Sequence, residues 1–186
     1  MGTIKATNIE PIADNGTVTL GSSGDTFSLG SGVVQSNLNY PAFEAYVNDS
    51  VNVTSNTNTK VQANTEVFDT DSCYDHTTNY RFTPNKAGKY FVYAKGRGDA
   101  SGTNNVQRVI SIIFKNGAEL INSPQYGNIS NPHNFFTPFV AGVVDMNGSS
   151  DYVEFYINVL VDSGTPDYFG NATLRTTSFG AYRIGS

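Results

Sequence analysis

From Tyr40 to the C-terminus the chain is a succession of short segments in which apolar and polar side chains alternate, separated by turn signals. In one of them, Val153 and Phe155 fall on one side while Glu154 and Tyr156 fall on the other. Such a period of two is typical of β-strands that bury one face. Residues that favour helices are scarce, which argues against a helical bundle. We therefore expect an all-β domain.

Roughly eight to ten strands are expected, forming an antiparallel sandwich or jelly roll. The expected strands lie at 42–47, 59–68, 80–83, 88–95, 106–115, 118–121, 135–146, 152–161, 168–176 and 179–184. Two of them end in Asn-Gly, at 116–117 and 147–148, a dipeptide of tight turns. Several strands are apolar on both faces, which indicates either a subunit interface or isolated exposed aromatic residues.

The first thirty residues contain a short repeat, Thr17-Val-Thr-Leu-Gly and Thr26-Phe-Ser-Leu-Gly, around a turn at 22–25. Two such copies bury little apolar surface, so they either dock on another protein or form a simple hairpin. We expect an attachment arm at 1–30, a linker at 31–40 and a jelly roll at 41–186. The apolar side chains expected to dock the arm are Ile4, Ile9, Ile12, Val18, Leu20 and Phe27.

Charge and composition exclude several classes of protein. The chain has 186 residues, 11 Lys and Arg, and a net charge of −5, so it lacks the basic face of a nucleic-acid or anionic-membrane binder. No apolar run approaches the length of a membrane span, and no signal peptide is visible at the N-terminus. The single cysteine, Cys73, permits no intrachain disulfide.

Residues for catalysis are sparse. There are two histidines, His76 and His133, and neither has the spacing of a zinc site or of a catalytic triad. Cys73 has no neighbouring base to activate it, so we expect no enzymatic activity and no cofactor. A small polysaccharide depolymerase remains a remote alternative. Three carboxylates, Asp69, Asp71 and Asp75, are weak candidates for calcium, and the alternative is a loop closed by Asx turns.

Four motifs are more specific than the alternation. They are Tyr74-Asp75 leading to Phe82-Thr83-Pro84, then Gly88-Lys89-Tyr90, Lys115-Asn116-Gly117 and Ser178-Phe179-Gly180. Together they resemble the signature of the complement globular-head family, a relative of the tumour necrosis factor fold.

This resemblance implies a ten-stranded antiparallel jelly roll that forms a homotrimer through aromatic faces. It also implies a binding module with no enzymatic activity. We expect Tyr90, Val92, Phe155 and Phe179 at the trimer interface. Two polar segments between strong strands, Gly96–Asn105 and Asn122–Asn134, are the loops expected to contact other molecules.

The N-terminal sequence 3–26 is similar to the opening of virion proteins of tailed bacteriophages. The resemblance implies a protein of the virion exterior, made in the bacterial cytoplasm, whose partners are copies of itself and a capsid or tail protein. We expect a trimer that decorates and cements the capsid. The alternative is the receptor-binding tip of a tail fibre, which contacts host glycan or protein.

Overall fold

The computed structural model describes residues 9, 18–19, 21–26, 31, 39–100, 105–128 and 133–185. The chain divides into two compact units, Met1–Ser36 and Asn37–Ser186. In the first unit the Asp25 amide donates to the Ser22 carbonyl (3.0 Å), and the Ser22 amide donates to Asp25 Oδ2 (2.7 Å). The turn predicted between the two repeat copies is therefore confirmed.

The second unit consists of strands and loops, and no helix occurs in the described part of the chain, hence none that could cross a membrane. The strands are β1 Ala42–Tyr46, β2 Val51–Asn52, β3 Thr59–Lys60, β4 Thr65–Asp69, β5 Tyr74–Asp75, β6 Arg81–Phe82, β7 Ala87–Lys95, β8 Gly98–Ala100, β9 Val106–Lys115, β10 Ala118–Tyr126, β11 Phe135–Phe136, β12 Phe139–Asn147, β13 Val153–Val161, β14 Pro166–Tyr168 and β15 Ser178–Gly185.

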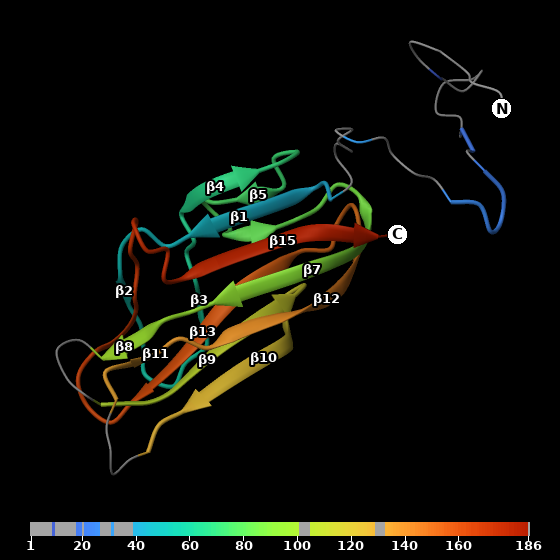
Figure 1. The fold of residues 1–186 in the computed structure, drawn as a ribbon. Coiled ribbons are helices and arrows are strands. Elements are labelled where there is room, and N and C mark those ends of the chain that lie inside the picture. Colours follow the sequence, from blue (N-terminus) through green and yellow to red (C-terminus); the bar gives the residue numbers. More distant parts are fainter. Residues whose placement is uncertain are drawn as a thin grey trace. The chain divides into compact units, whose positions relative to one another are not determined.

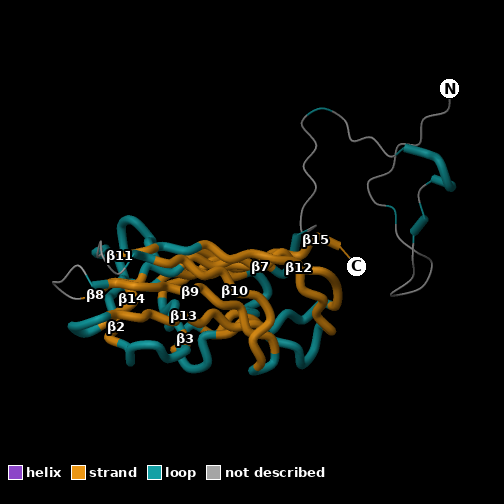
Figure 2. The backbone as a smooth tube through the Cα atoms, turned by 90° about the horizontal axis from the view of Figure 1, so that it is seen from below, coloured by secondary structure: helices purple, strands orange, loops and turns teal. Residues whose placement is uncertain are grey.

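Two antiparallel sheets pack face to face (Figures 1 and 2). One has five strands in the order β12-β7-β15-β1-β4. The other has the order β10-β9-β13-β6-β5, with β3 added beside β13. A small sheet, β11-β8-β14-β2, gathers at one end. The prediction of an all-β antiparallel fold is confirmed, whereas ten strands become fifteen because several are only two or three residues long.

The strand predictions fail where side chains compete for the backbone. The strand expected at 168–176 ends at Tyr168, because Asn171 Oδ1 accepts the amides of Thr173 (3.0 Å) and Leu174 (2.7 Å) and closes a turn. The strand expected at 59–68 is divided into β3 and β4. In the other direction, β10 continues beyond Ile121 to Tyr126.

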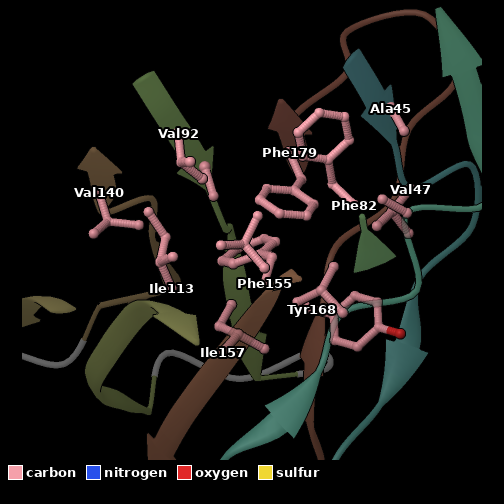
Figure 3. Packing of buried hydrophobic residues seen from close by; sticks show 14 of the residues in the cluster. Ala45, Val47, Phe82, Val92, Ile113, Val140, Phe155, Ile157, Tyr168 and Phe179 are labelled. Atoms are coloured by element: carbon pink, nitrogen blue, oxygen red, sulfur yellow. The ribbon is translucent and has the colours of Figure 1, made fainter. Parts of the chain in front are cut away.

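Aromatic rings from both sheets fill the space between them. Phe43 stacks on Tyr74 and Phe82, with ring centroids 4.3 and 4.7 Å apart, and meets Phe179 edge-on at 5.0 Å. Figure 3 shows Phe155 and Phe179 pointing into the same cluster from opposite sheets. Offset and edge-on pairs of this kind add to the energy of apolar burial.

The four residues predicted at the trimer interface belong to this core. Tyr90, Val92, Phe155 and Phe179 are each 0% exposed in a single chain. Their side chains point between the sheets and are not available to a neighbouring subunit. The prediction that they form the interface is wrong, because these positions lie on the face of each strand that packs against the other sheet.

The strand directions give the jelly roll two distinct ends. At the terminal end, the Arg183 amide near the close of β15 donates to the Asn39 carbonyl (3.2 Å), just before β1. At the loop end lie β2, β8, β11 and β14, because β1 and β7 run toward it while β12 and β15 start there (Figure 1). The chain therefore enters and leaves this unit at the same end.

Candidate functional site

The outward face of the five-stranded sheet carries large apolar side chains in register. In one row Val143 on β12 and Tyr182 on β15 both pair with Phe91 on β7. Because directly paired residues share a face, the neighbouring rows extend the patch across all five strands. We call it the aromatic face; its members are Tyr46, Phe68, Phe91, Tyr93, Phe139, Val143 and Tyr182.

The ring of Tyr93 lies across a glycine on the neighbouring strand. A Cβ on Gly180 would stand 2.4 Å from the Tyr93 ring and 3.0 Å from the Phe43 carbonyl, so only glycine fits there. This close approach lets Tyr93 Oη reach over β15 and donate to Glu44 Oε2 on β1 (2.9 Å). Burial, together with this hydrogen bond to a carboxylate, raises the pKa of Tyr93. The ring is thus fixed in position before any partner binds.

Apart from Lys95, the charges on this side of the sheet are paired. Arg175 Nη1 lies 3.7 Å from Glu44 Oε1, and its guanidinium carbon stands 5.4 Å from the centre of the Tyr46 ring. At the margin, Lys89 Nζ lies 2.7 Å from Asp145 Oδ1 in an exposed ion pair. Phe91 lies at the centre of the aromatic face. Its ring centroid is 5.6 Å from that of Tyr182 and 6.2 Å from that of Tyr93.

Exposure shows that this face is incompletely covered. Phe68, Phe139 and Val143 are 44%, 56% and 54% exposed, while the other members are half-buried. Single exposed apolar residues are ordinary, whereas a contiguous apolar patch is typical of an interaction surface. An interaction through this face would bury aromatic rings that are already ordered.

The sequence contains a signal for this face in the spacing of its charged residues. On β7, Phe91 and Tyr93 alternate in step with Lys89 and Lys95, and charged neighbours two residues away mark the side of a strand that faces solvent. The opposite set is small and aliphatic apart from Tyr90. The same parity argument would have identified Tyr182 through its pairing with Phe91 only once the register was known.

The three aspartates proposed for calcium are held apart by their own loop. Asp69 accepts the amides of Cys73 (3.1 Å) and Tyr74 (2.9 Å), and burial raises its pKa against the lowering effect of these bonds. Asp71 lies in the turn between Asp69 and Cys73 and has a positive φ of 65°. No three metal-binding side chains come together among the described residues. The Asp69 carboxylate therefore acts as a cap of the turn.

Asp75 closes the next turn with five donors. Its carboxylate accepts the amides of Thr77 (3.1 Å), Thr78 (2.9 Å) and Asn79 (3.1 Å), besides the side chains of Thr77 and Asn79. These bonds, the Thr78 amide first, hold the pKa of Asp75 well below its usual range. A side-chain carboxylate that caps its own turn in this way forms an Asx turn. Such a turn is the alternative to a calcium site that the sequence indicated.

Replacing Asp75 with alanine is therefore expected to lower the free energy of unfolding by about 1 kcal/mol at pH 7, the usual effect of losing a cap. Because the folded pKa lies below the unfolded value of about 3.9, this stabilisation is complete above that value. It is lost as the pH falls through the folded pKa. Urea unfolding of both proteins between pH 7 and pH 2 should show their difference shrinking only below about pH 4. A difference that is constant with pH would contradict the charged cap.

The other potentially reactive residues are tied to neighbours. His76 Nδ1 lies 2.6 Å from Glu66 Oε1, and the His133 ring centroid lies 4.8 Å from that of Phe136. Cys73 is buried, and burial raises the pKa of its thiol, which disfavours the nucleophilic thiolate.

Two sets of predicted contact residues are only partly described. Of the arm residues, Ile9 and Val18 are exposed, at 61% and 39%, and the remaining four lie outside the described residues. Of the predicted contact loops, Gly96–Asn105 includes the short strand β8, and Asn122–Asn134 begins within β10. Positions 101–104 and 129–132 lie outside the described residues.

In sequence comparisons, no family model and no curated protein matches this chain. Among solved structures, it is similar to the tumour necrosis factor Eiger from S. frugiperda, with a TM-score of 0.53 and 12% identity over 80% of this chain and 94% of that one. It is also similar to the globular domain of the zebrafish complement 1qA protein, with a TM-score of 0.53 and 13% identity over 77% and 97%. The jelly-roll fold shared with these two families is thereby established, as the sequence motifs predicted.

Proposed function

We propose that this protein is a homotrimeric binding module whose subunits meet through the aromatic face. The observation that carries the proposal is the register-aligned row of Val143, Phe91 and Tyr182, only partly covered on the outside of the sandwich. A closed three-fold assembly would cover such a face in every subunit without creating an open filament. The jelly-roll fold and the sequence resemblance support the same assembly.

We further propose that the trimer decorates and cements the exterior of a bacteriophage capsid. Support comes from the similarity of residues 3–26 to the opening of phage virion proteins, and from the apolar arm that precedes the jelly roll. Docking six large apolar side chains at about 1.5–3 kcal/mol each would hold a subunit on a particle even after ordering costs. The arm's attachment residues are Ile4, Ile9, Ile12, Val18, Leu20 and Phe27.

The second candidate function is the receptor-binding tip of a tail fibre. The observation in its favour is the loop end, where the chain segments after β7 and before β12 lie opposite the end at which the chain enters. In either role the protein acts by adhesion. The proposal includes no catalysis and no metal, in keeping with carboxylates and histidines that are engaged by their own loops.

Removing residues 1–30 is the direct test of the attachment arm. The truncated protein is expected to remain a folded trimer, because the jelly roll has its own core. Its occupancy on virions that lack the protein should fall at least about tenfold relative to the full chain. Quantitative gel analysis of particles after sedimentation measures this occupancy, with circular dichroism as the control for folding.

Normal occupancy of the truncated protein would contradict the arm as the means of attachment. Electron cryo-microscopy of the same particles separates the two candidate roles. Density at capsid three-folds supports the decoration protein, whereas density only at fibre ends supports the tail tip and overturns the capsid role.

A further inference from the structure

A four-residue hydrogen-bonded network lies on the outward face of the other sheet. Arg108 Nη2 on β9 donates to Asn158 Oδ1 on β13 (3.1 Å) and to Asn56 Oδ1 before β3 (2.5 Å). Asn158 Nδ2 donates in turn to Asn58 Oδ1 (2.9 Å). We call these residues the amide–arginine network. All of its planar groups are fixed by one another.

The network uses up its acceptors and leaves donors. The Oδ1 atoms of Asn56, Asn58 and Asn158 are each occupied by a bond within the network. Arg108 Nη1 and the Nδ2 groups of Asn56 and Asn58 have no acceptor among the described residues, and both asparagines are exposed. A ligand that supplies acceptors therefore complements these free donors.

The positive charge of this cluster has no neutralising carboxylate among the described residues. Arg108 forms no ion pair with any described carboxylate, although the protein is acidic overall. Its Nε is buried without a hydrogen-bond partner, a cost that an aliphatic side chain would avoid. A buried polar group that stability does not explain suggests a role in binding. Guanidinium and amide donors on one surface are suited to a carboxylate.

Apolar surface lies directly beside the network. Tyr126 on β10 and Leu160 on β13 both pair with Arg108 in register, so all three side chains share the outward face. Tyr126 is 67% exposed, and its neighbour Pro124 on the same strand is paired with Ile110. An exposed aromatic ring beside fixed polar groups is suited to a ligand that has one apolar face and many oxygens. A sugar ring is a ligand of this kind.

We propose that the amide–arginine network and Tyr126 form a binding site for an acidic saccharide, with a sugar carboxylate at Arg108 and a sugar ring on Tyr126. The inference deepens the proposed adhesive role and rests on it. It does not depend on the trimer, because the site lies within one subunit on the sheet opposite the aromatic face. The donors of Asn56 and Asn58 would bind ring or hydroxyl oxygens of the same saccharide.

Titration calorimetry of the full chain with trigalacturonic acid tests the site. Binding is expected with a Kd of about 1 mM or tighter, and the methyl ester of the same trisaccharide should bind at least about tenfold more weakly. Tyr126→Ala and Arg108→Gln should each weaken binding about tenfold or more. Arg81→Gln is the matched control, since Arg81 stacks on Tyr152 in the same sheet and should leave binding unchanged.

Equal binding of the ester would overturn the role of the carboxylate, and unchanged binding by Tyr126→Ala would overturn the location. Absence of binding by the wild-type protein would overturn the site altogether. Sedimentation of the same samples and occupancy on particles report on the proposed function separately. A protein that trimerises and decorates virions but binds no saccharide refutes this inference alone.

Discussion

Replacing Phe91 with aspartate is expected to convert the proposed trimer into a folded monomer. Phe91 lies at the centre of the aromatic face, between Tyr93 and Tyr182, and its side chain does not enter the sandwich core. The change removes about 2 kcal/mol of apolar burial per interface and adds the cost of burying an unpaired carboxylate, several kcal/mol more. Because the loss is repeated at three interfaces, association at micromolar concentration should disappear.

Sedimentation velocity at micromolar concentration measures this outcome, with circular dichroism to confirm that the subunit stays folded. Tyr126→Asp is the matched control, because Tyr126 is 67% exposed on the other sheet and should leave the trimer intact. A Phe91→Asp protein that still sediments as a trimer would show that the subunits meet elsewhere. A wild-type protein that is monomeric at this concentration would refute the trimer itself.

Truncating Phe179 to alanine is expected to reduce the free energy of unfolding of the subunit by about 3–5 kcal/mol, the usual cost of deleting a fully buried phenylalanine. Phe179 is 0% exposed, and its ring contacts Phe43 on one side and Phe155 of the opposite sheet on the other. The cavity would therefore open between the two sheets.

The measurement is best made in the Phe91→Asp background, so that association does not contribute to the apparent stability. Guanidinium denaturation should give the loss stated above for Phe179→Ala. Val143→Ala, at a position that is 54% exposed on the aromatic face, should change stability by less than about 0.5 kcal/mol. Equal effects of the two substitutions would contradict the assignment of Phe179 to the core.

Strong alternation with turn residues at both ends was sufficient to locate the long strands. β9 has the bounds that the sequence predicted, and its link to β10 is the predicted Asn116-Gly117 turn, with φ of 52° and 80°. A two-residue hairpin turn of this type requires positive φ at both positions, which Asn and Gly adopt readily. The dipeptide alone was therefore sufficient to predict the turn. The shared jelly-roll fold followed from motifs of the same kind.

The identity of the buried face could not be obtained from alternation alone. A strand such as β7 offers two apolar sets, and only packing against the second sheet decides that Tyr90 and Val92 point inward. Likewise the amide–arginine network joins residues from three separate segments of the chain, at 56–58, 108 and 158. Contacts between positions so far apart depend on strand register, which one sequence does not specify.

The hydrogen bond from the Arg183 amide to the Asn39 carbonyl has a practical consequence for protein engineering. Cargo fused after β15 would emerge beside Asn39, at the end of the jelly roll where the chain enters. The opposite end offers a better insertion point at the exposed turn before β14, where Gly164 has a φ of 85°. Exposed loop tips tolerate insertions because no ladder or core contact is interrupted. A displayed peptide there would project from the far side of the jelly roll.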